Sequence, residues 1–446
     1  MSNPVLDVSS REHEVPAPLP LSAVDELILH LQDARSPWNV QVEMGVAGRI
    51  DEARLHQAVL ACIRRHPMAR ARLAPWRRTD RSYSWRFAEE ADVCPVRLAR
   101  CPDDAALEEL RRQLHGERIE LHTSPGFRVV LARCATRDVV LLSANHVVAD
   151  GVGALRLMQS IGRAYRAVDD PLDPSPLHRA RDLTALLIPG GHGERRARRW
   201  EVVRRVREAL DPPARLAGGG SDPAQGVGFV CRVVGLDDAP ALADRAPQTS
   251  INDVLLAALH LTAARWNDAA GDRTARIGVM MPVNLRPPER FWEVVGNFAS
   301  MVTISTHPRE RLDLATATAA VAAQTREVRR EARARGLFDL FELVAGTLVG
   351  IKRLVVRLLP LGGERLIDTA VLSNLGRLAE PPSFDGDAPP ELWFSPPCDR
   401  ACSIGVGVVT VGPSLMLTVR HRLEVFDRSA AQRFTDAFVA QLAELS

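Results

Sequence analysis

The sequence lacks several features that mark large classes of protein. Its 57 basic and 55 acidic residues leave a net charge of only +2, which gives no reason to expect nucleic acid as a partner. Seven scattered cysteines, an odd number, do not form a disulfide framework. The closest pair, Cys398 and Cys402, has no second pair or histidine cluster at metal-site spacing. We therefore expect no bound metal and no nucleic-acid partner.

The first residues of the sequence are not expected to be a signal peptide. Residues 1–18 contain acidic residues and prolines but no apolar core of a signal peptide, and we expect them to be loosely attached. Together with the cysteine usage, this favours a cytoplasmic protein. One long apolar run, residues 338–361, is interrupted by Lys352, Arg353 and Arg357. A membrane span needs ~20 mostly apolar residues, so we expect a core or channel-lining helix, with peripheral membrane contact as the less favoured alternative.

The composition that is present is that of a soluble globular protein. Hydrophobic residues make up 46% of the chain and charged residues 25%, and 446 residues suggest two or three domains. Both halves run strand, helix, strands, helix, which predicts an α/β fold (an α+β sandwich). We expect one subdomain at residues 19–175, a second at 227–446, and between them a linker at 176–226 with a basic helix.

Periodicity predicts the individual elements of each half. The first half has expected strands at 40–46, 83–87, 93–98, 127–134 and 139–142, and helices beginning near 22, at 52–65, at 104–114 and after 151. The second half has expected strands at 229–234, 277–282 and 301–306, a hairpin between 402 and 420, and helices at 251–264, at 312–335 and from 427.

The chain is organised around residues 138–166. An apolar run at 139–142 predicts a buried strand, and the residues after Gly151 have helical spacing. His146 is therefore expected on the turn between them, where a side chain is held rigidly yet faces a cavity. A neutral imidazole can take a proton from a hydroxyl or an amine near pH 7. Asp150 could hold the turn through an arginine, and Gly151 removes a side chain where substrate or helix comes close.

Two interpretations of His146 stay open on the residues alone. No G-x-S-x-G elbow occurs in the sequence, so the chemistry points to a general base rather than to a covalent nucleophile. The alternative is that His146 is a packed, hydrogen-bonded residue at the end of a strand, with no part in any reaction.

The motif around His146 resembles that of a known superfamily. Residues 145–151, N-H-V-V-A-D-G, are similar to the H-H-x-x-x-D-G motif of the condensation-domain and CoA-dependent acyltransferase superfamily. By this resemblance His146, Asp150 and Gly151 are the catalytic motif, with His146 as the base. Asn145 stands where the first histidine is expected. This departure weakens a peptide-condensation function more than it weakens catalysis.

Further stretches extend the resemblance over most of residues 20–445. The sequence P-V-N-L-R-P followed by G-N looks like alcohol and wax-type acyltransferases, and implies that Arg286 fixes the loop bearing Asp150. The sequence S-N-L-G at 373–376 resembles a loop near the substrate tunnel, after a strand. Ser373 or Asn374 would there donate a hydrogen bond to the oxyanion or hold the donor. The implied architecture is two chloramphenicol-acetyltransferase-like subdomains that form a V-shaped pseudo-dimer with a tunnel between them.

The resemblance implies a free-standing acyltransferase. Its donor would be an acyl thioester on coenzyme A or on the phosphopantetheine arm of an acyl or peptidyl carrier protein, used as a substrate rather than a bound cofactor. We expect an alcohol as acceptor, an ester as product and a monomeric protein. Two alternatives remain: a stand-alone condensation enzyme that forms amides with an amine acceptor, and a non-catalytic member that binds a metabolite or carrier protein.

Overall fold

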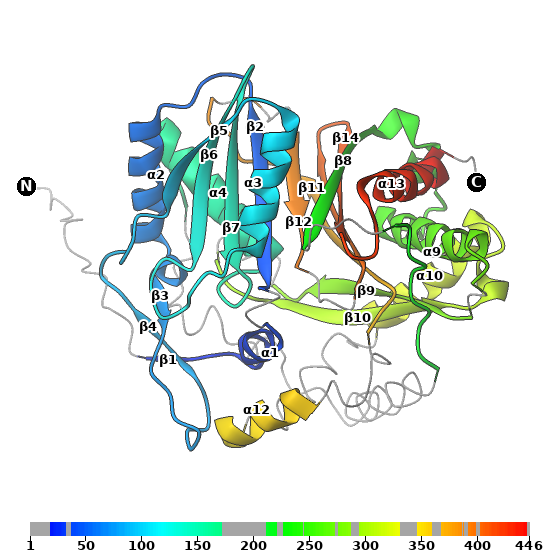
Figure 1. Ribbon diagram of the computed structural model, residues 1–446, viewed down its shortest axis with the longest axis horizontal. Coiled ribbons are helices and arrows are strands. Elements are labelled where there is room, and N and C mark those ends of the chain that lie inside the picture. The colour runs from blue at the N-terminus through cyan, green and yellow to red at the C-terminus, as the bar shows by residue number, and fades with distance from the viewer. Residues whose placement is uncertain are drawn as a thin grey trace, which may run out of the picture.

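The computed structural model describes most of the chain. The described residues are 18–32, 37–171, 211–220, 226–243, 245–272, 275–286, 294–330, 346–358, 367–385, 387, 391–397 and 402–443. Residues 1–17, most of the expected linker and Cys398 lie outside them. The described elements form two lobes, each built on its own large sheet, which lie side by side in Figure 1.

The first lobe is a five-stranded sheet between helices, in the strand order β12-β2-β7-β6-β5. Its strands are β2 (Asn39–Val46), β5 (Val96–Cys101), β6 (Phe127–Cys134), β7 (Asp138–Asn145) and β12 (Glu391–Ser395). Helices α2 (Glu52–Arg65) and α4 (Gly151–Arg166) share a core with one face, and α3 (Asp104–Gly116) packs on the other. The predicted helix at 52–65 and the antiparallel neighbours β6 and β7 are confirmed.

A smaller layer lies below this sheet in Figure 1. It consists of the strands β1 (Leu19–Pro20), β4 (Ser84–Phe87) and β3 (Ala71–Leu73), the short helix η1 (Pro67–Arg70), and α1 (Ala23–Leu31). Ser22 caps α1 as predicted, because its hydroxyl accepts from the backbone N–H of Asp25 while the Asp25 carboxylate accepts from that of Ser22. This capping box fixes the buried Asp25 at the start of α1.

The second lobe is a six-stranded sheet in the order β10-β9-β11-β13-β14-β8. Its strands are β8 (Val227–Gly235), β9 (Ile277–Asn284), β10 (Ala299–Thr306), β11 (Ala370–Leu378), β13 (Ile404–Val411) and β14 (Ser414–Arg422). Helices α9 (Ile251–Ala269), α10 (Leu314–Arg330) and α13 (Arg428–Ala443) share its core and cover one face. The remaining short helices are η2 (Leu236–Asp238), α8 (Pro240–Ala243) and η4 (Pro308–Glu310).

The hairpin predicted near the C-terminus is confirmed. Strands β13 and β14 pair antiparallel from Ile404↔His421 to Val411↔Ser414. Gly412 turns the chain between them with φ +55°, a conformation that suits glycine because it has no Cβ.

Strand β12 joins the two halves of the chain in a way that the sequence did not predict. It pairs antiparallel with β2, so a segment from the second half completes the sheet of the first lobe. Gly407 of β13 makes this crossing possible: a Cβ there would lie 1.9 Å from the carbonyl oxygen of Phe394. The S-N-L-G sequence, expected as a loop after a strand, instead lies inside β11, where the pairing with β13 is irregular between Asn374 and Arg377.

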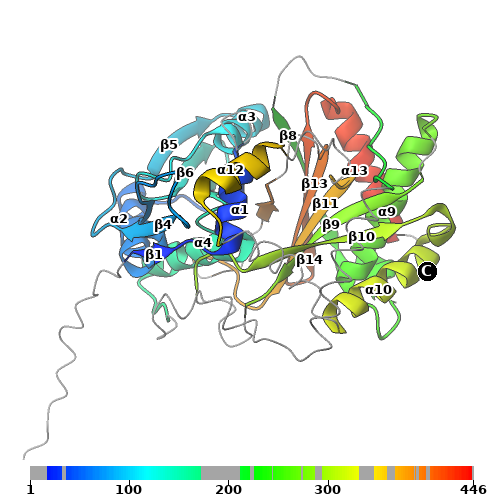
Figure 2. The same cartoon turned by 90° about the horizontal axis from the view of Figure 1, so that it is seen from below.

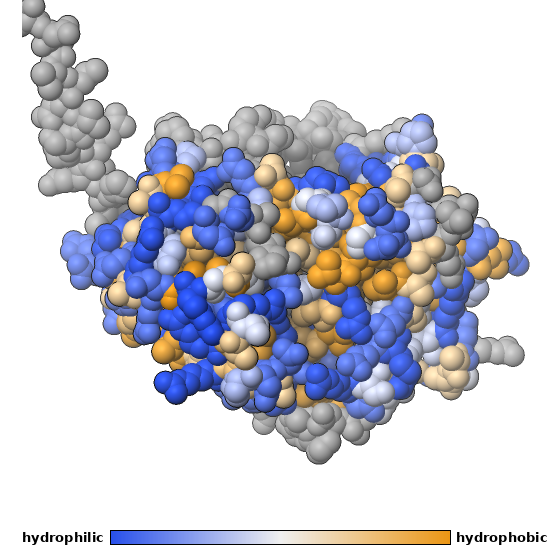
Figure 3. Space-filling view, turned by 90° about the horizontal axis from the view of Figure 1, so that it is seen from above, coloured by the Kyte–Doolittle hydropathy of each residue, from blue (hydrophilic) through white to orange (hydrophobic). Residues whose placement is uncertain are grey.

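The interpretation of residues 338–361 as a core or channel-lining helix is wrong for the part that is described. Helix α12 (Val349–Leu358) lies beside α1 at the periphery of the molecule (Figure 2). Ile351 and Leu354 are 48% and 56% exposed, whereas the side chain of Lys352 is only 5% exposed. None of the described helices is long and apolar enough to cross a membrane. On the opposite side, seen in Figure 3, the surface is mostly hydrophilic, with apolar residues gathered near its middle.

We expect Gly407→Ala to destabilise the protein by about 3 kcal/mol, at the upper end of overpacking costs, because the added methyl meets backbone rather than a movable side chain. Gly116→Ala is the control, since nothing lies within 4 Å of its added Cβ. It should change the free energy of unfolding by less than about 0.5 kcal/mol. Urea unfolding of the two variants checks this, and equal stability would contradict the close approach of β12 to β13.

Candidate active site

The site is built on the turn between β7 and α4. All eight residues of β7 are buried, and the strand is held antiparallel to β2. His146 follows it directly and donates its backbone N–H to the carbonyl of Trp38, at 2.8 Å. The Asp150 carboxylate caps α4 by accepting the N–H of Gly153 at 2.8 Å. His146 thus lies on a short turn between a buried strand and a helix, as the sequence predicted.

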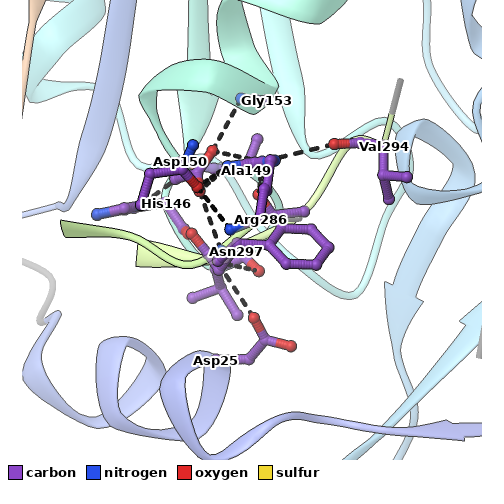
Figure 4. A network of polar contacts seen from close by, with 12 residues as sticks. Asp25, His146, Ala149, Asp150, Gly153, Arg286, Val294 and Asn297 are labelled. Carbon is purple, nitrogen blue, oxygen red and sulfur yellow. Dashed lines mark hydrogen bonds and ion pairs between the residues drawn. The ribbon is translucent and has the colours of Figure 1, made fainter. Parts of the chain in front are cut away.

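The imidazole of His146 is oriented as a neutral base. Its Nδ1 lies 3.1 Å from the carbonyl oxygen of Ala149. Because a carbonyl oxygen only accepts, Nδ1 carries the proton and the lone pair belongs to Nε2. Within the described part of the chain, no residue hydrogen-bonds Nε2. His146 is partly exposed, and its ring stacks on that of Trp38 with 6.3 Å between the ring centroids. The ring extends away from the Asp150–Arg286 pair (Figure 4).

The surroundings keep this imidazole uncharged. Burial lowers the pKa of His146 below its ordinary value of 6.5, and this effect exceeds the opposing attraction of the Asp150 carboxylate and the hydrogen bond to Ala149. At pH 7 the ring is therefore neutral, which is the protonation state that a general base needs.

The Asp150 carboxylate is bound on every side. Arg286, just after β9 of the second lobe, donates Nη1 to Oδ2 at 2.7 Å and Nη2 to Oδ1 at 2.8 Å. The backbone N–H of Phe298 donates to Oδ2 at 3.0 Å, in addition to the bond from Gly153. Burial opposes ionisation, but Arg286 and these hydrogen bonds together lower the pKa of Asp150. Asp150 is thus a positioning residue, because its carboxylate is committed to Arg286 and to backbone donors.

The Asp150–Arg286 ion pair expected from the sequence is confirmed, and it is deeply buried. The two side chains are 5% and 1% exposed. Arg286 also donates Nη2 to the carbonyl of Gly296 at 3.0 Å, and its guanidinium lies over the Phe298 ring at 4.4 Å from the centroid. A bidentate pair with further hydrogen bonds offsets the desolvation of two buried charges. It joins the start of α4 to the second lobe.

Asn297 is a positioning residue to which sequence reasoning gave no role. Its amide Nδ2 donates to the carbonyls of His146 at 2.6 Å and Val147 at 3.0 Å, and to the Asp25 carboxylate at 3.1 Å. One side chain therefore joins the backbone of the His146 turn to α1 (Figure 4). The G-N dipeptide after P-V-N-L-R-P is the signal that could have identified it.

Asn145, where the resemblance expects a histidine, has a structural role in this site. It is 3% exposed, its Nδ2 donates to the carbonyl of Ile119 at 3.0 Å, and its Oδ1 accepts the N–H of Val147 at 3.0 Å. Both ends of the amide are therefore occupied, and the side chain ties the turn to the loop at Ile119.

Gly151 is needed because the second half of the chain comes close. A Cβ there would lie 2.8 Å from the ring of Phe394 in β12 and 2.9 Å from Cδ2 of Leu375 in β11. The neighbours of Gly151 are thus side chains of the protein itself. This contact brings the S-N-L-G segment next to the start of α4.

Ser373 and Asn374 differ in what they can offer a reactant. The Ser373 hydroxyl has no hydrogen-bond partner among the described residues, and its Cα pairs with that of Gly407, which lies against the Phe394 carbonyl. The Asn374 Oδ1 accepts the N–H of Gly376 at 2.8 Å and so stabilises the irregular part of β11. Neither residue is hydrogen-bonded to His146.

Comparison with known proteins places the chain in a family. The family model of the condensation domain matches residues 21–179. An uncharacterized protein of Mycobacterium tuberculosis is 34% identical over 429 residues, which cover 93% of this chain and 97% of that protein. The chain belongs to the condensation-domain family. Members of this family are acyl and peptidyl transferases. A linear gramicidin synthase polypeptide of Brevibacillus parabrevis is 21% identical over 98% of this chain but only 9% of its own length.

Solved condensation domains have the same fold. The first condensation domain of the calcium-dependent antibiotic synthetase superposes with a TM-score of 0.72 at 14% identity, over 97% of this chain and 96% of that one. The condensation domain of the monacolin K polyketide synthase gives 0.66 at 16% identity, over 96% and 97%. The predicted α/β fold is therefore confirmed.

We expect Arg286→Met to lower the free energy of unfolding by about 3–5 kcal/mol, because it leaves the Asp150 carboxylate buried without its counter-ion. Arg232→Met is the matched control: its partner Asp436 is 60% exposed, and such surface pairs contribute about 1 kcal/mol or less. Urea unfolding of both variants measures the difference. Equal stability would show that the buried pair does not hold the two lobes together.

Proposed function

We propose that this condensation-family protein is a free-standing acyltransferase that moves an acyl group from a thioester to an alcohol and forms an ester. The observation that carries the proposal is the state of His146: Nδ1 is fixed by the Ala149 carbonyl, and the lone pair of Nε2 belongs to a partly exposed, neutral ring. The donor thioester is carried on coenzyme A or on the phosphopantetheine arm of a carrier protein.

In the proposed reaction His146 acts as general base and then as general acid. Nε2 takes the proton of the acceptor hydroxyl while its oxygen attacks the thioester carbonyl. The tetrahedral intermediate collapses, the C–S bond breaks, and the imidazolium returns the proton to the leaving thiolate. The products are an ester and a free thiol, and no acyl-enzyme forms. The base contributes ~10²–10⁴-fold, and holding both reactants between the lobes adds effective molarity.

Ser373 is the proposed donor to the oxyanion. Acyl transfer places negative charge on the former carbonyl oxygen. A hydrogen-bond donor aimed at this oxygen stabilises the transition state by about 3 kcal/mol. The Ser373 hydroxyl is uncommitted among the described residues, and its strand reaches the start of α4 through Leu375. Asn374 is the weaker candidate, because its side chain already stabilises β11.

Amide formation is the second candidate function. It is favoured by the similarity to the gramicidin synthase polypeptide and to condensation domains of synthetases. Ester formation is favoured by the P-V-N-L-R-P and G-N sequences and by Asn145, whose side chain is committed to the backbone of Ile119 and Val147. Arg286 and Asn297 of those sequences provide the contacts that hold the His146 turn.

Purified protein should transfer an acyl group from an acyl-CoA or acyl-carrier protein to a panel of alcohols in preference to matched amines, with thiol release and product mass as readouts. His146→Ala should reduce kcat/KM by ~10²–10⁴-fold while the circular dichroism spectrum is unchanged. His307→Ala is the control and should keep full turnover, because that side chain is 53% exposed on the second lobe. Preference for amines would support amide formation, and binding without transfer by the wild-type protein would support the non-catalytic alternative.

The pH dependence gives a separate test of the base. The neutral imidazole is the active form, so kcat/KM should fall with a slope of one as the pH drops through the pKa of His146. Because that pKa lies below 6.5, the midpoint of the decline should also lie below pH 6.5. Asp150 does not contribute to this limb, since its own pKa is lowered. A midpoint at or above 6.5 would contradict the assigned state of His146.

A further inference from the structure

Helix α12 is attached to the protein through its polar side. Lys352, the single lysine of the sequence, places Nζ 2.5 Å from Oε2 of Glu26 in α1 and 2.8 Å from the carbonyl of Arg81. Both side chains of this ion pair are almost fully buried, at 5% and 7% exposure. Glu26 is fixed further because its Oε1 accepts the N–H of Tyr83 at 3.1 Å.

Val349 at the start of the same helix is buried in the core of the first lobe, but three aliphatic residues of this segment face outward. Leu348, Ile351 and Leu354 are 39%, 48% and 56% exposed. Leu348 directly precedes the helix, and Ile351 and Leu354 lie three residues apart on one side of it. A surface helix of a soluble protein normally turns its apolar stripe toward the core, and the outward positions of Ile351 and Leu354 depart from that arrangement. A contiguous exposed aliphatic stripe of this kind marks a contact surface.

The stripe is bordered by positive charge. Residues 77–81 are hydrogen-bonded to the start of α12, where Val349 donates its N–H to the Asp80 carbonyl at 2.7 Å and Gly350 to the Arg78 carbonyl at 2.9 Å. Arg77, Arg78 and Arg81 are exposed, and none forms an ion pair with a described residue. These three arginines outnumber the one acidic residue of the segment, Asp80, so the overall charge balance of the chain hides a local basic cluster.

Aromatic side chains lie at the margin between the stripe and the cluster. The Arg353 guanidinium lies over the Trp76 ring at 4.7 Å from the centroid, and Trp76 packs edge-on against Tyr83 at 5.2 Å. Trp76 is partly exposed. Tryptophan beside arginine at the edge of an apolar surface is typical of the boundary between lipid headgroups and acyl chains.

We propose that α12 and residues 76–81 dock the protein on an anionic phospholipid surface, with the aliphatic stripe among the upper acyl chains and the arginines on the headgroups. Helix α12 has ten residues, so it lies in the interface and does not span. A short row of exposed aliphatic side chains bordered by arginines suits a fluid anionic lipid surface better than a protein, which needs a complementary packed patch of about 800 Å².

Co-sedimentation with lipid vesicles tests this docking. The protein is mixed with phosphatidylcholine vesicles that either lack phosphatidylglycerol or contain about 30 mol % of this anionic lipid. Binding should require the anionic lipid and weaken as the salt concentration rises. The Ile351→Glu/Leu354→Glu and Arg77→Glu/Arg78→Glu variants should each lower the partition coefficient roughly tenfold or more. Circular dichroism and thermal unfolding establish that each variant is folded.

Two control variants test whether a loss of vesicle binding is specific to this surface or follows from any added negative charge. Leu98→Glu places a charge at an equally exposed aliphatic position of the first lobe, 48% exposed, and should leave binding unchanged. Arg118→Glu/Arg309→Glu gives the same change in net charge elsewhere and should also leave binding unchanged. Equal loss in these controls, absence of binding to anionic vesicles, or self-association through α12 without vesicle binding would each overturn the proposal.

Discussion

The buried ion pair between Asp150 and Arg286 is the interaction on which the site depends. Asp150 caps the first helix turn after the His146 loop, and Arg286 follows a strand of the other lobe. Two buried opposite charges tolerate little change in geometry, because any separation leaves each charge desolvated and unpaired. The pair therefore fixes both the conformation of the loop and the position of the second lobe against it.

The same pair decides the chemistry of the histidine. A carboxylate free to accept from an imidazole would favour its protonated form, but the Asp150 carboxylate already accepts from Arg286, Gly153 and Phe298. His146 is oriented instead by donating its Nδ1–H to a neutral backbone carbonyl, that of Ala149. The result is an imidazole with a defined tautomer and a lowered pKa, which is oriented without being charged.

Local patterns predicted the parts of the structure that local physics determines. The run at 139–142, the turn and the helical spacing after Gly151 correctly indicate β7, the place of His146 and α4, because burial periodicity and capping are encoded within a few residues. Strand β12 was missed, since nothing in a five-residue stretch says that its partner lies about 350 residues earlier. The prediction for α12 was wrong because the whole apolar run was assumed to face inward, whereas Lys352 binds the buried Glu26 and Ile351 and Leu354 face outward.

The glycines show why long-range contacts limit any such prediction. The sequence suggests that Gly151 leaves room for substrate or helix; in the structure the space is taken by Phe394 and Leu375, which arrive from β12 and β11. Phe394 also places its carbonyl against Gly407, so two glycines far apart in the chain accommodate one crossing strand. That strand packs against the first turn of α4. The position of the loop that carries His146 therefore depends on the packing between the two lobes. The reactivity of one imidazole is in this way a property of the closed two-lobed fold, and a substitution at β12 would act on it without touching a reactant.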